Sequence, residues 1–352
     1  MKKVNFERIK SNSSNIFFKK ERSFLYKTKE ELPKRVRLEA CTLCQLNCVA
    51  CWMRLGAEEI KKTDGFGYLR FKDFKKFVDD NPQIESIELS NNGEIFLNPE
   101  LDEIIKYAYE KKIVLTAYNG VNLNTLSDEM AEILVKYQFR EMTVSIDGAT
   151  PDVYKIYRRG GDLNKVIANI KKINEYKKKY NSEFPILTYK FIVFSHNIED
   201  IPLAKKLAKE LNMYIKFDQN SQTWYDKLSE EQKIRAEKLS GEKFEETTEK
   251  FYLEKYKKNN SKYFFCIDLF EKPQIDWNGK LLGCCFPTIS KFNVNVFKQG
   301  LFKSLNNIRV LYVKRMLTDF SVPPKDGFLC TDCTVYKLLK EENFELFKNK
   351  NV

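Results

Sequence analysis

The sequence lacks any apolar run near the ~20 residues that a membrane-spanning helix requires. Its opening segment, MKKVNFERIKSNSSN, is basic but contains no apolar core of the kind that secretory signals carry. These absences predict a cytoplasmic protein with no membrane partner. Disulfides are rare in that reducing compartment, so the nine cysteines indicate metal binding or redox chemistry instead.

Histidine is almost as scarce, since His196 is the only one in the chain. No Ser–His–Asp set can be assembled without it, and a lone histidine after a predicted strand is more often a surface residue than a general base. The chain also contains no phosphate-binding loop of the G-x4-GK type. These absences argue against a triad hydrolase and against a P-loop nucleotidase.

Acidic residues are outnumbered by basic ones, 49 to 61, which gives a net charge of +12. Such an excess favours acidic partners in general, including phosphorylated small molecules, anionic sugars, nucleic acid and acidic peptides. Much of it lies in runs such as 177–179, which are typical of a lysine-rich, solvated surface. Basic and aromatic residues alternate at 18–27, yet no nucleic-acid-binding motif accompanies them, so we do not expect that partner.

Strand and helix patterns alternate along the chain from about residue 35. The expected strands are 35–40, 84–90, 112–118, 140–147, 185–194 and 213–218. The expected helices are 71–80, 100–111, 127–137 with Ser127 as its N-cap, 162–180 and 199–211. Such alternation is typical of parallel strands joined by crossover helices. We therefore predict an α/β fold, a partial (β/α)6 TIM-like barrel whose binding residues lie at the carboxyl ends of the strands.

The composition divides the chain into four parts. Residues 1–34 form a basic N-terminal arm, 35–220 the barrel, 221–261 a charged helical linker, and 262–352 a small C-terminal domain. The last part is short and loop-rich and contains five of the nine cysteines. A domain of this size needs extra stabilisation, so a bound metal centre would explain how it folds.

Three cysteines follow the first predicted strand, in the spacing Cys44-x3-Cys48-x2-Cys51. Thiolates are ligands for both iron–sulfur clusters and zinc. Three of them on a four-iron cluster leave one iron without a protein ligand, and that iron can bind a substrate. Cys41 and Cys44 also form a C-x2-C pair, so a zinc site remains an alternative.

The Cys44-x3-Cys48-x2-Cys51 motif resembles that of the radical S-adenosylmethionine superfamily, and four further segments after predicted strands two, three and four resemble other motifs of that family. NNGE (91–94) resembles its Gly-Gly-Glu motif, YNG (118–120) its Thr-Asn-Gly turn, and SIDG (145–148) and YRRGG (157–161) the segments that hold the methionine carboxylate. The resemblance implies that the cofactor-binding residues are Asn92, Gly93, Glu94, Asn119, Ser145, Asp147 and Arg158.

The resemblance implies a [4Fe–4S] cluster on the three cysteines that binds S-adenosylmethionine. An external one-electron reductant, such as flavodoxin or ferredoxin, would supply the electron that cleaves it to methionine and a 5′-deoxyadenosyl radical. Two departures from the family pattern stand out. Asn92 replaces a glycine, and Ala50 stands where many members carry an aromatic residue that stacks on adenine, with Trp52 as a substitute.

The second cysteine group resembles the auxiliary-cluster extension of the same superfamily, the SPASM domain or its shortened "twitch" form. The resemblance implies one auxiliary [4Fe–4S] cluster, fully ligated by Cys266, Cys284, Cys330 and Cys333. Cys285 is left over, as a packed thiol or a hydrogen-atom donor. A structural zinc on the same four thiolates is the alternative.

A fully ligated cluster can accept an electron after hydrogen abstraction, which favours a two-electron oxidation. The hypothesis is therefore oxidation of a sugar or aminocyclitol alcohol by a radical S-adenosylmethionine oxidoreductase, with a carbohydrate-like substrate favoured over a peptide. The alternatives within enzymes are a peptide- or protein-modifying maturase and a sugar epimerase. The alternative from another class is a zinc-stabilised, basic nucleic-acid-binding protein.

Overall fold

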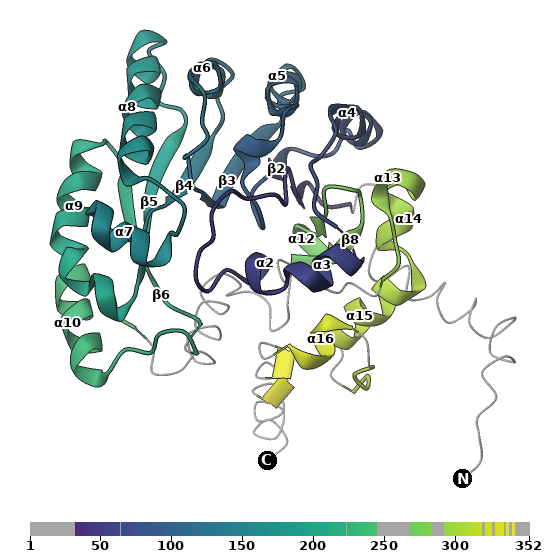
Figure 1. The fold of residues 1–352 in the computed structure, drawn as a ribbon. Coiled ribbons are helices and arrows are strands. Elements are labelled where there is room, and N and C mark those ends of the chain that lie inside the picture. The colour runs from purple at the N-terminus through teal and green to yellow at the C-terminus, as the bar shows by residue number, and fades with distance from the viewer. Residues whose placement is uncertain are drawn as a thin grey trace, which may run out of the picture.

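The computed structural model describes residues 32–63, 65–222, 224–244, 268–283, 292–318, 321–325, 328–333, 336–337 and 340–341. Its centre is an eight-stranded sheet with the strand order β6-β5-β4-β3-β2-β1-β7-β8 (Figure 1). The strands are β1 (Arg35–Leu38), β2 (Ser86–Glu88), β3 (Val114–Val121), β4 (Glu141–Ser145), β5 (Ile186–Val193), β6 (Tyr214–Gln219), β7 (Gln274–Ile275) and β8 (Leu281–Gly283).

The first six strands are parallel and lie side by side in the order of the sequence. Helices connect them, as the strand–helix alternation predicts. The main crossover helices are α4 (Phe71–Asp80), α5 (Leu101–Glu110), α6 (Asp128–Lys136), α8 (Leu163–Lys179) and α9 (Ile201–Glu210). The α/β class and the mostly parallel sheet are therefore confirmed.

Shorter helices fill the connections and the C-terminal part. Before β6 they are α2 (Trp52–Leu55), α3 (Ala57–Thr63), η3 (Ile95–Leu97), α7 (Pro151–Tyr157) and η4 (Ser195–Asp200). After β6 they are α10 (Glu230–Ser240), α12 (Asp268–Glu271), α13 (Val296–Gln299), α14 (Leu301–Leu305), α15 (Ile308–Thr318) and α16 (Leu329–Asp332). Of these, α10 lies in the predicted linker; residues 245–261 of that linker, and 1–31 of the N-terminal arm, lie outside the described residues.

The two faces of the sheet differ in chemistry. Val36, Ile87 and Leu115 are partners in neighbouring strands, are buried, and belong to one apolar core with residues of α4, α5, α6 and α8. Figure 1 shows these helices as a layer along one side of the sheet. The next partners along the same strands, Arg37 and Glu88, point to the opposite face because side chains alternate along a strand. The helix-covered face is therefore apolar, and the inner face is polar.

The C-terminal part adds two strands to the barrel sheet, which the sequence did not predict. β7 pairs in parallel with β1, and β8 returns antiparallel to β7. Trp277, in the turn between them, packs on Gly67, where an added Cβ would lie 2.6 Å from its ring. Residues 262–352, expected to form a small C-terminal domain, contribute β7 and β8 to the sheet of residues 35–220, and the division of the chain into domains stays a prediction.

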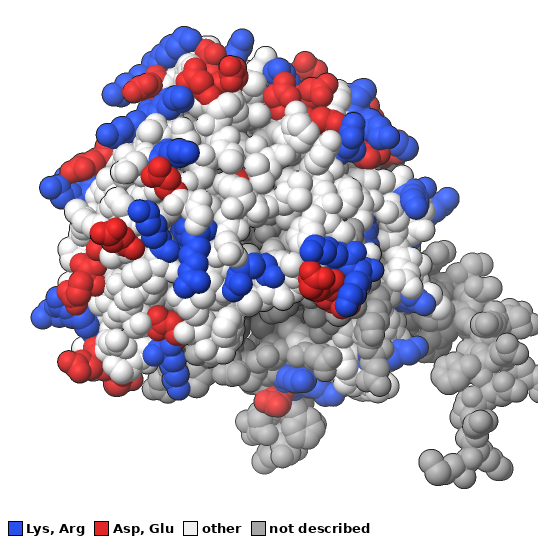
Figure 2. All heavy atoms as spheres, viewed as in Figure 1, with Lys and Arg blue, Asp and Glu red and all other residues white. Residues whose placement is uncertain are grey.

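Charged side chains of both signs are interspersed on the face shown in Figure 2. This arrangement fits the interpretation of the lysine runs as solvated surface. Within the described residues, no helix has the length and apolar character needed to cross a membrane. A cytoplasmic location stays a prediction.

Replacing Ser127 with alanine is expected to destabilise the fold by about 1 kcal/mol. The Ser127 hydroxyl accepts a hydrogen bond from the backbone N–H of Met130 at 3.1 Å, as predicted for the N-cap of α6. Alanine leaves that donor without a partner. Urea unfolding measures the loss, and Ser127→Asp, which restores a capping oxygen, should return the midpoint to that of the wild type. An equal loss in both variants would contradict the capping role.

Candidate functional site

The cysteine loop, residues 41–51, begins at the carboxyl end of β1. Cys48 is buried, Cys51 is partly buried and is the N-cap residue of α2, and Cys44 is exposed. Backbone hydrogen bonds fasten the loop to the segment after α7: Asn47 N–H donates to the Arg159 carbonyl at 2.7 Å, and Val49 N–H to the Tyr157 carbonyl at 3.3 Å. The structure therefore holds all three thiols of the motif in one loop at the carboxyl end of β1.

Arg54 of α2 reaches back over the cysteine loop. Its guanidinium donates from Nε to the Cys48 carbonyl at 3.0 Å and from Nη2 to the Val49 carbonyl. These bonds fasten α2 to the backbone of the cysteine loop. Arg54 was not singled out in the sequence, because a surface arginine on a short helix has no distinguishing pattern.

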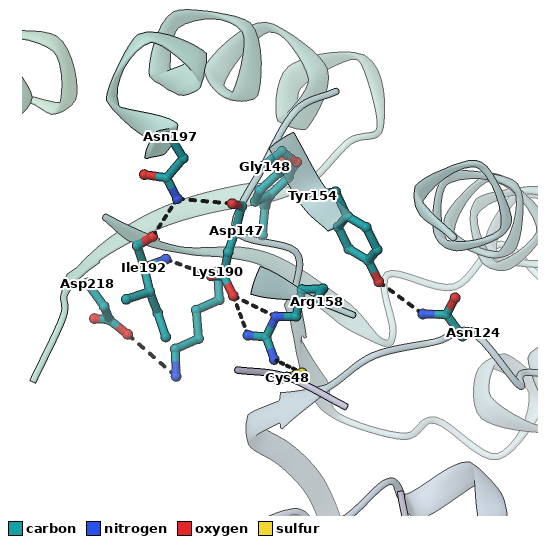
Figure 3. A network of polar contacts seen from close by, with 11 residues as sticks. Cys48, Asn124, Asp147, Gly148, Tyr154, Arg158, Lys190, Ile192, Asn197 and Asp218 are labelled. Atoms are coloured by element: carbon teal, nitrogen blue, oxygen red, sulfur yellow. Dashed lines mark hydrogen bonds and ion pairs between the residues drawn. The ribbon is translucent and has the colours of Figure 1, made fainter. Parts of the chain in front are cut away.

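Arg158 links the cysteine loop to the end of β4 (Figure 3). Its guanidinium forms an ion pair with the fully buried Asp147 through Nε, at 2.6 Å, and Nη2. Its Nη1 points at the Cys48 Sγ, 3.7 Å away. Asp147 is held in turn by the Ile192 N–H, which donates to its other carboxylate oxygen at 2.7 Å. Two residues predicted for cofactor binding thus contact each other and one predicted cluster ligand.

Asn122, just after β3, connects Cys44 with Glu94. Its side-chain Nδ2 lies 3.8 Å from the Cys44 Sγ, and its backbone N–H donates to the Glu94 carboxylate at 2.6 Å. Asn122 was not singled out in the sequence. A polar residue directly after a buried parallel strand is the signal that could have indicated it.

The turn 91–94 lies against the cysteine loop. Glu94 N–H donates to the Leu43 carbonyl at 2.8 Å, and a Cβ on Gly93 would lie 2.2 Å from the Cys41 carbonyl oxygen. Only glycine permits this approach of two backbones. Glu39, at the end of β1, accepts a hydrogen bond from the Asn91 N–H at 3.3 Å and supports the turn from below.

The remaining predicted cofactor residues surround the same turn. Asn92 contacts the side chain of Asn91 at 3.2 Å, and Asn119 donates to the Asn91 side chain at 3.4 Å. Ser145 is buried at the end of β4, and a Cβ on Gly120 would lie 2.5 Å from its hydroxyl. The seven predicted residues therefore lie around one edge of the sheet, the edge from which the cysteine loop also leaves.

Glu94 has the properties expected of a ligand-binding carboxylate. It is 1% exposed, and its Oε1 has no hydrogen-bond partner among the described residues. Burial raises the pKa of Glu94 to about 7. A buried acceptor without a partner indicates a missing donor, and an amino group such as that of methionine supplies one. Residues on this edge thus fit S-adenosylmethionine, and the three soft thiols fit an iron–sulfur cluster.

Cys41 differs from the three motif cysteines. It is fully buried, and its thiol points at the Leu43 carbonyl at 3.8 Å. A fully buried thiol of this kind behaves as a packing residue. No group of three or more His, Cys, Asp or Glu side chains in the described part of the chain is placed to hold a single metal ion. The thiolates of a four-iron cluster bind different irons and need not meet at one point.

Only half of the predicted auxiliary ligand set can be located. Cys330 and Cys333 lie at either end of the single turn α16, both partly buried. Cys266, Cys284 and the extra Cys285 lie outside the described residues. The auxiliary cluster therefore stays a prediction.

His196 is mostly buried instead of lying on the surface. Its ring stacks on Phe194 with centroids 5.4 Å apart, and its Nδ1 lies 3.9 Å from the Asp226 carboxylate. Burial lowers the pKa of His196, although Asp226 opposes that effect. The imidazole therefore packs at the end of β5, with its Nε2 buried and without a hydrogen-bond partner among the described residues.

Comparison with known proteins bears on this assignment. Residues 38–204 match the Radical SAM superfamily. GTP 3′,8-cyclase of Clostridium botulinum is 26% identical over 187 residues, which cover 52% of this chain and 54% of that protein. Probable GTP 3′,8-cyclase of Methanocaldococcus jannaschii is 23% identical over 182 residues, which cover 49% of this chain and 57% of that protein. The chain thus spans about half the length of the curated relatives it matches.

Solved structures share the fold at low sequence identity. SuiB of Streptococcus suis bound to S-adenosylmethionine superposes with a TM-score of 0.63 at 16% identity, covering 87% of this chain and 72% of SuiB. The anSMEcpe structure with bound AdoMet gives a TM-score of 0.55 at 16% identity, covering 91% and 96%. The prediction of a radical S-adenosylmethionine domain is confirmed for residues 38–204.

Proposed function

We propose that this chain, whose residues 38–204 form a domain of the radical SAM superfamily, initiates radical chemistry by reductive cleavage of S-adenosylmethionine. The family implies a [4Fe–4S] cluster, which when bound supplies the electron that breaks the sulfonium bond and releases methionine and a 5′-deoxyadenosyl radical. An external one-electron reductant is needed to reduce the cluster. One observation carries the proposal. Asn122 contacts both Cys44 and Glu94, and Arg158 contacts both Cys48 and Asp147, so the cysteine loop is tied to the predicted cofactor-binding residues.

The chain's own residues hold the cofactor. Cys44, Cys48 and Cys51 would bind three irons, and the partnerless Glu94 Oε1 would accept a hydrogen bond from the methionine amino group. Ser145 and Asn119 line the same edge. Arg158 already pairs with Asp147, so its role is to orient the cysteine loop as well as to attract the methionine carboxylate.

The substrate is a polar molecule in this proposal. The inner face of the sheet carries the polar side chains Arg37, Glu88, Thr116 and Lys190, whereas the opposite face is apolar. Within that face Thr116 already donates to Glu88, and Lys190 pairs with Asp218. Hydroxyl and amine groups of a sugar or aminocyclitol match such side chains. The proposed outcome is oxidation of an alcohol, with the second electron passed to an auxiliary cluster on Cys266, Cys284, Cys330 and Cys333.

Peptide modification is the second candidate function. SuiB bound to its precursor peptide SuiA shares the fold over 91% of this chain, with a TM-score of 0.62, and this similarity gives no support to a carbohydrate over a peptide. At 16% identity it supports a common architecture and not a common substrate. Product analysis separates the candidate functions: a ketone formed together with 5′-deoxyadenosine favours alcohol oxidation, an unchanged oxidation state of the sugar favours epimerisation, and a changed mass of an added peptide favours peptide modification.

Metal content and cofactor cleavage test the proposal together. The chain reconstituted anaerobically with iron and sulfide should contain about eight irons and no zinc. With reductant and S-adenosylmethionine it should release 5′-deoxyadenosine and methionine in equal amounts. Cys330→Ala should lower the iron content to about four while deoxyadenosine still forms. A colourless protein with about two zinc ions would point to the zinc-stabilised alternative and refute the proposal.

A further inference from the structure

Two of the three motif thiols receive a protein N–H donor from outside the cysteine loop. The Asn122 Nδ2 lies 3.8 Å from the Cys44 Sγ, and the Arg158 Nη1 lies 3.7 Å from the Cys48 Sγ (Figure 3 shows the second contact). Both distances are within the range of N–H···S hydrogen bonds. The donors come from the ends of different elements, β3 and α7, so their convergence on adjacent thiols is a property of the fold.

The orientation of the Asn122 side chain follows from its neighbours. Its Oδ1 accepts the backbone N–H of Asn124 at 2.9 Å and the Gln45 Nε2 at 2.7 Å. A backbone N–H can only donate, so the atom facing Asn124 must be oxygen. The amide nitrogen therefore faces the Cys44 sulfur and cannot exchange places with the oxygen.

Asn122 is also held rigidly. It is 5% exposed, and its backbone N–H is bound to the buried Glu94 carboxylate at 2.6 Å. Arg158 is oriented in the same way, because Nε and Nη2 are fixed by Asp147 and only Nη1 remains for Cys48. The Arg158 Nη1 therefore faces the Cys48 sulfur, and the Asn122 Nδ2 faces the Cys44 sulfur and, at 3.5 Å, the Gln45 Oε1.

We propose that Asn122 is a positioning residue that raises the reduction potential of the cluster on Cys44, Cys48 and Cys51. Reduction adds one electron to a centre whose negative charge is spread over its sulfurs. An N–H donor stabilises the reduced form more than the oxidised form, because the reduced sulfurs carry more charge. The inference rests on the proposed function, since it requires a cluster on these three cysteines.

The test replaces the donor without changing the shape of the side chain. Asn122→Asp puts a carboxylate oxygen where the amide nitrogen faces Cys44. We expect the cluster to become harder to reduce, with the ratio of reduced to oxidised cluster at a fixed potential falling at least about tenfold, equivalent to ~59 mV for one electron. The readout is an anaerobic redox titration of the reconstituted full chain, following the electron paramagnetic resonance signal that changes when S-adenosylmethionine is added.

Two further variants keep the result interpretable. Asn174→Asp makes the same chemical change in α8, where the amide donates to the Leu211 carbonyl at 2.6 Å and no cysteine is contacted; it should leave the potential unchanged. Asn122→Ala removes the donor without adding charge and should shift the potential in the same direction by less. If Asn122→Asp binds no iron, Asn122→Ala decides the question.

The outcomes separate this inference from the proposed function. A wild type that binds no iron–sulfur cluster would refute the function itself. A wild type with a normal cluster, together with Asn122 variants whose potential matches that of Asn174→Asp, would overturn only the role of Asn122.

Discussion

Replacing Cys48 with alanine is expected to abolish 5′-deoxyadenosine formation, by roughly a hundredfold or more. Loss of a residue that only supports a metal ligand already costs 10–100-fold, and Cys48 is proposed as a ligand itself. It is also the buried member of the set and the one that Arg158 contacts, so no nearby cysteine can take its position. Deoxyadenosine is measured by chromatography after reaction with reductant and S-adenosylmethionine.

Cys41→Ala is the matched control, because it removes another thiol from the same loop. Cys41 is fully buried and points at a carbonyl, so its loss should lower stability slightly and leave both iron content and deoxyadenosine formation intact. Turnover that survives in Cys48→Ala would remove the main claim. A loss of turnover in both variants would show that the loop needs every thiol, and that Cys41 is not a packing residue.

Arg158→Met is expected to destabilise the protein by about 3–5 kcal/mol, because it leaves the Asp147 carboxylate buried without a cation. Asp147 is fully buried, and the Arg158 side chain is 13% exposed. The loss is measured by denaturant unfolding of chain that has not been reconstituted, so that a loss of iron does not contribute. Asp147→Asn combined with Arg158→Met should restore much of the stability, since no buried charge is then unpaired.

Arg159→Met is the control for the same change one position later. The Arg159 side chain is exposed, and only its backbone carbonyl contacts the cysteine loop. Arg159→Met should lower the free energy of unfolding by less than about 0.5 kcal/mol. If Arg158→Met costs no more than Arg159→Met, the pair with Asp147 does not stabilise the fold.

The local sequence pattern was sufficient to predict most strands and helices of residues 35–220. The strands β1 to β6 and the helices α4, α5, α6, α8 and α9 lie within a few residues of the expected ranges, because their apolar periodicity is set by the one face they bury. α7 was missed, although Thr150 caps it and Pro151 occupies its first turn. Seven residues give too few repeats for a periodic signal.

The residues of the site were predictable where they belong to a sequence motif. The cysteine spacing and the segments after the strands located Glu94, Asp147 and Arg158, because each lies in a segment that resembles a motif of the superfamily. Asn122 was not predicted, since its contact with Cys44 joins residues far apart in the sequence. Arg54 was not predicted because a surface arginine on a short helix has no distinguishing pattern. Likewise, a two-residue strand such as β7 has no pattern of its own and exists only beside β1.

The pairing of β7 with β1 has a consequence for how the chain reaches its fold. β1 has two neighbours in the sheet, β2 and β7. β2 follows soon after β1 during synthesis, whereas β7 is synthesised more than 200 residues later. Until then the edge of β1 has unpaired backbone groups, which can pair with another chain. Contacts this distant in sequence also form slowly. We therefore expect the yield of folded protein to depend on how long the edge of β1 stays unpaired. Slower synthesis at low temperature, with chaperones present, should change that yield more than the stability of the folded sheet does.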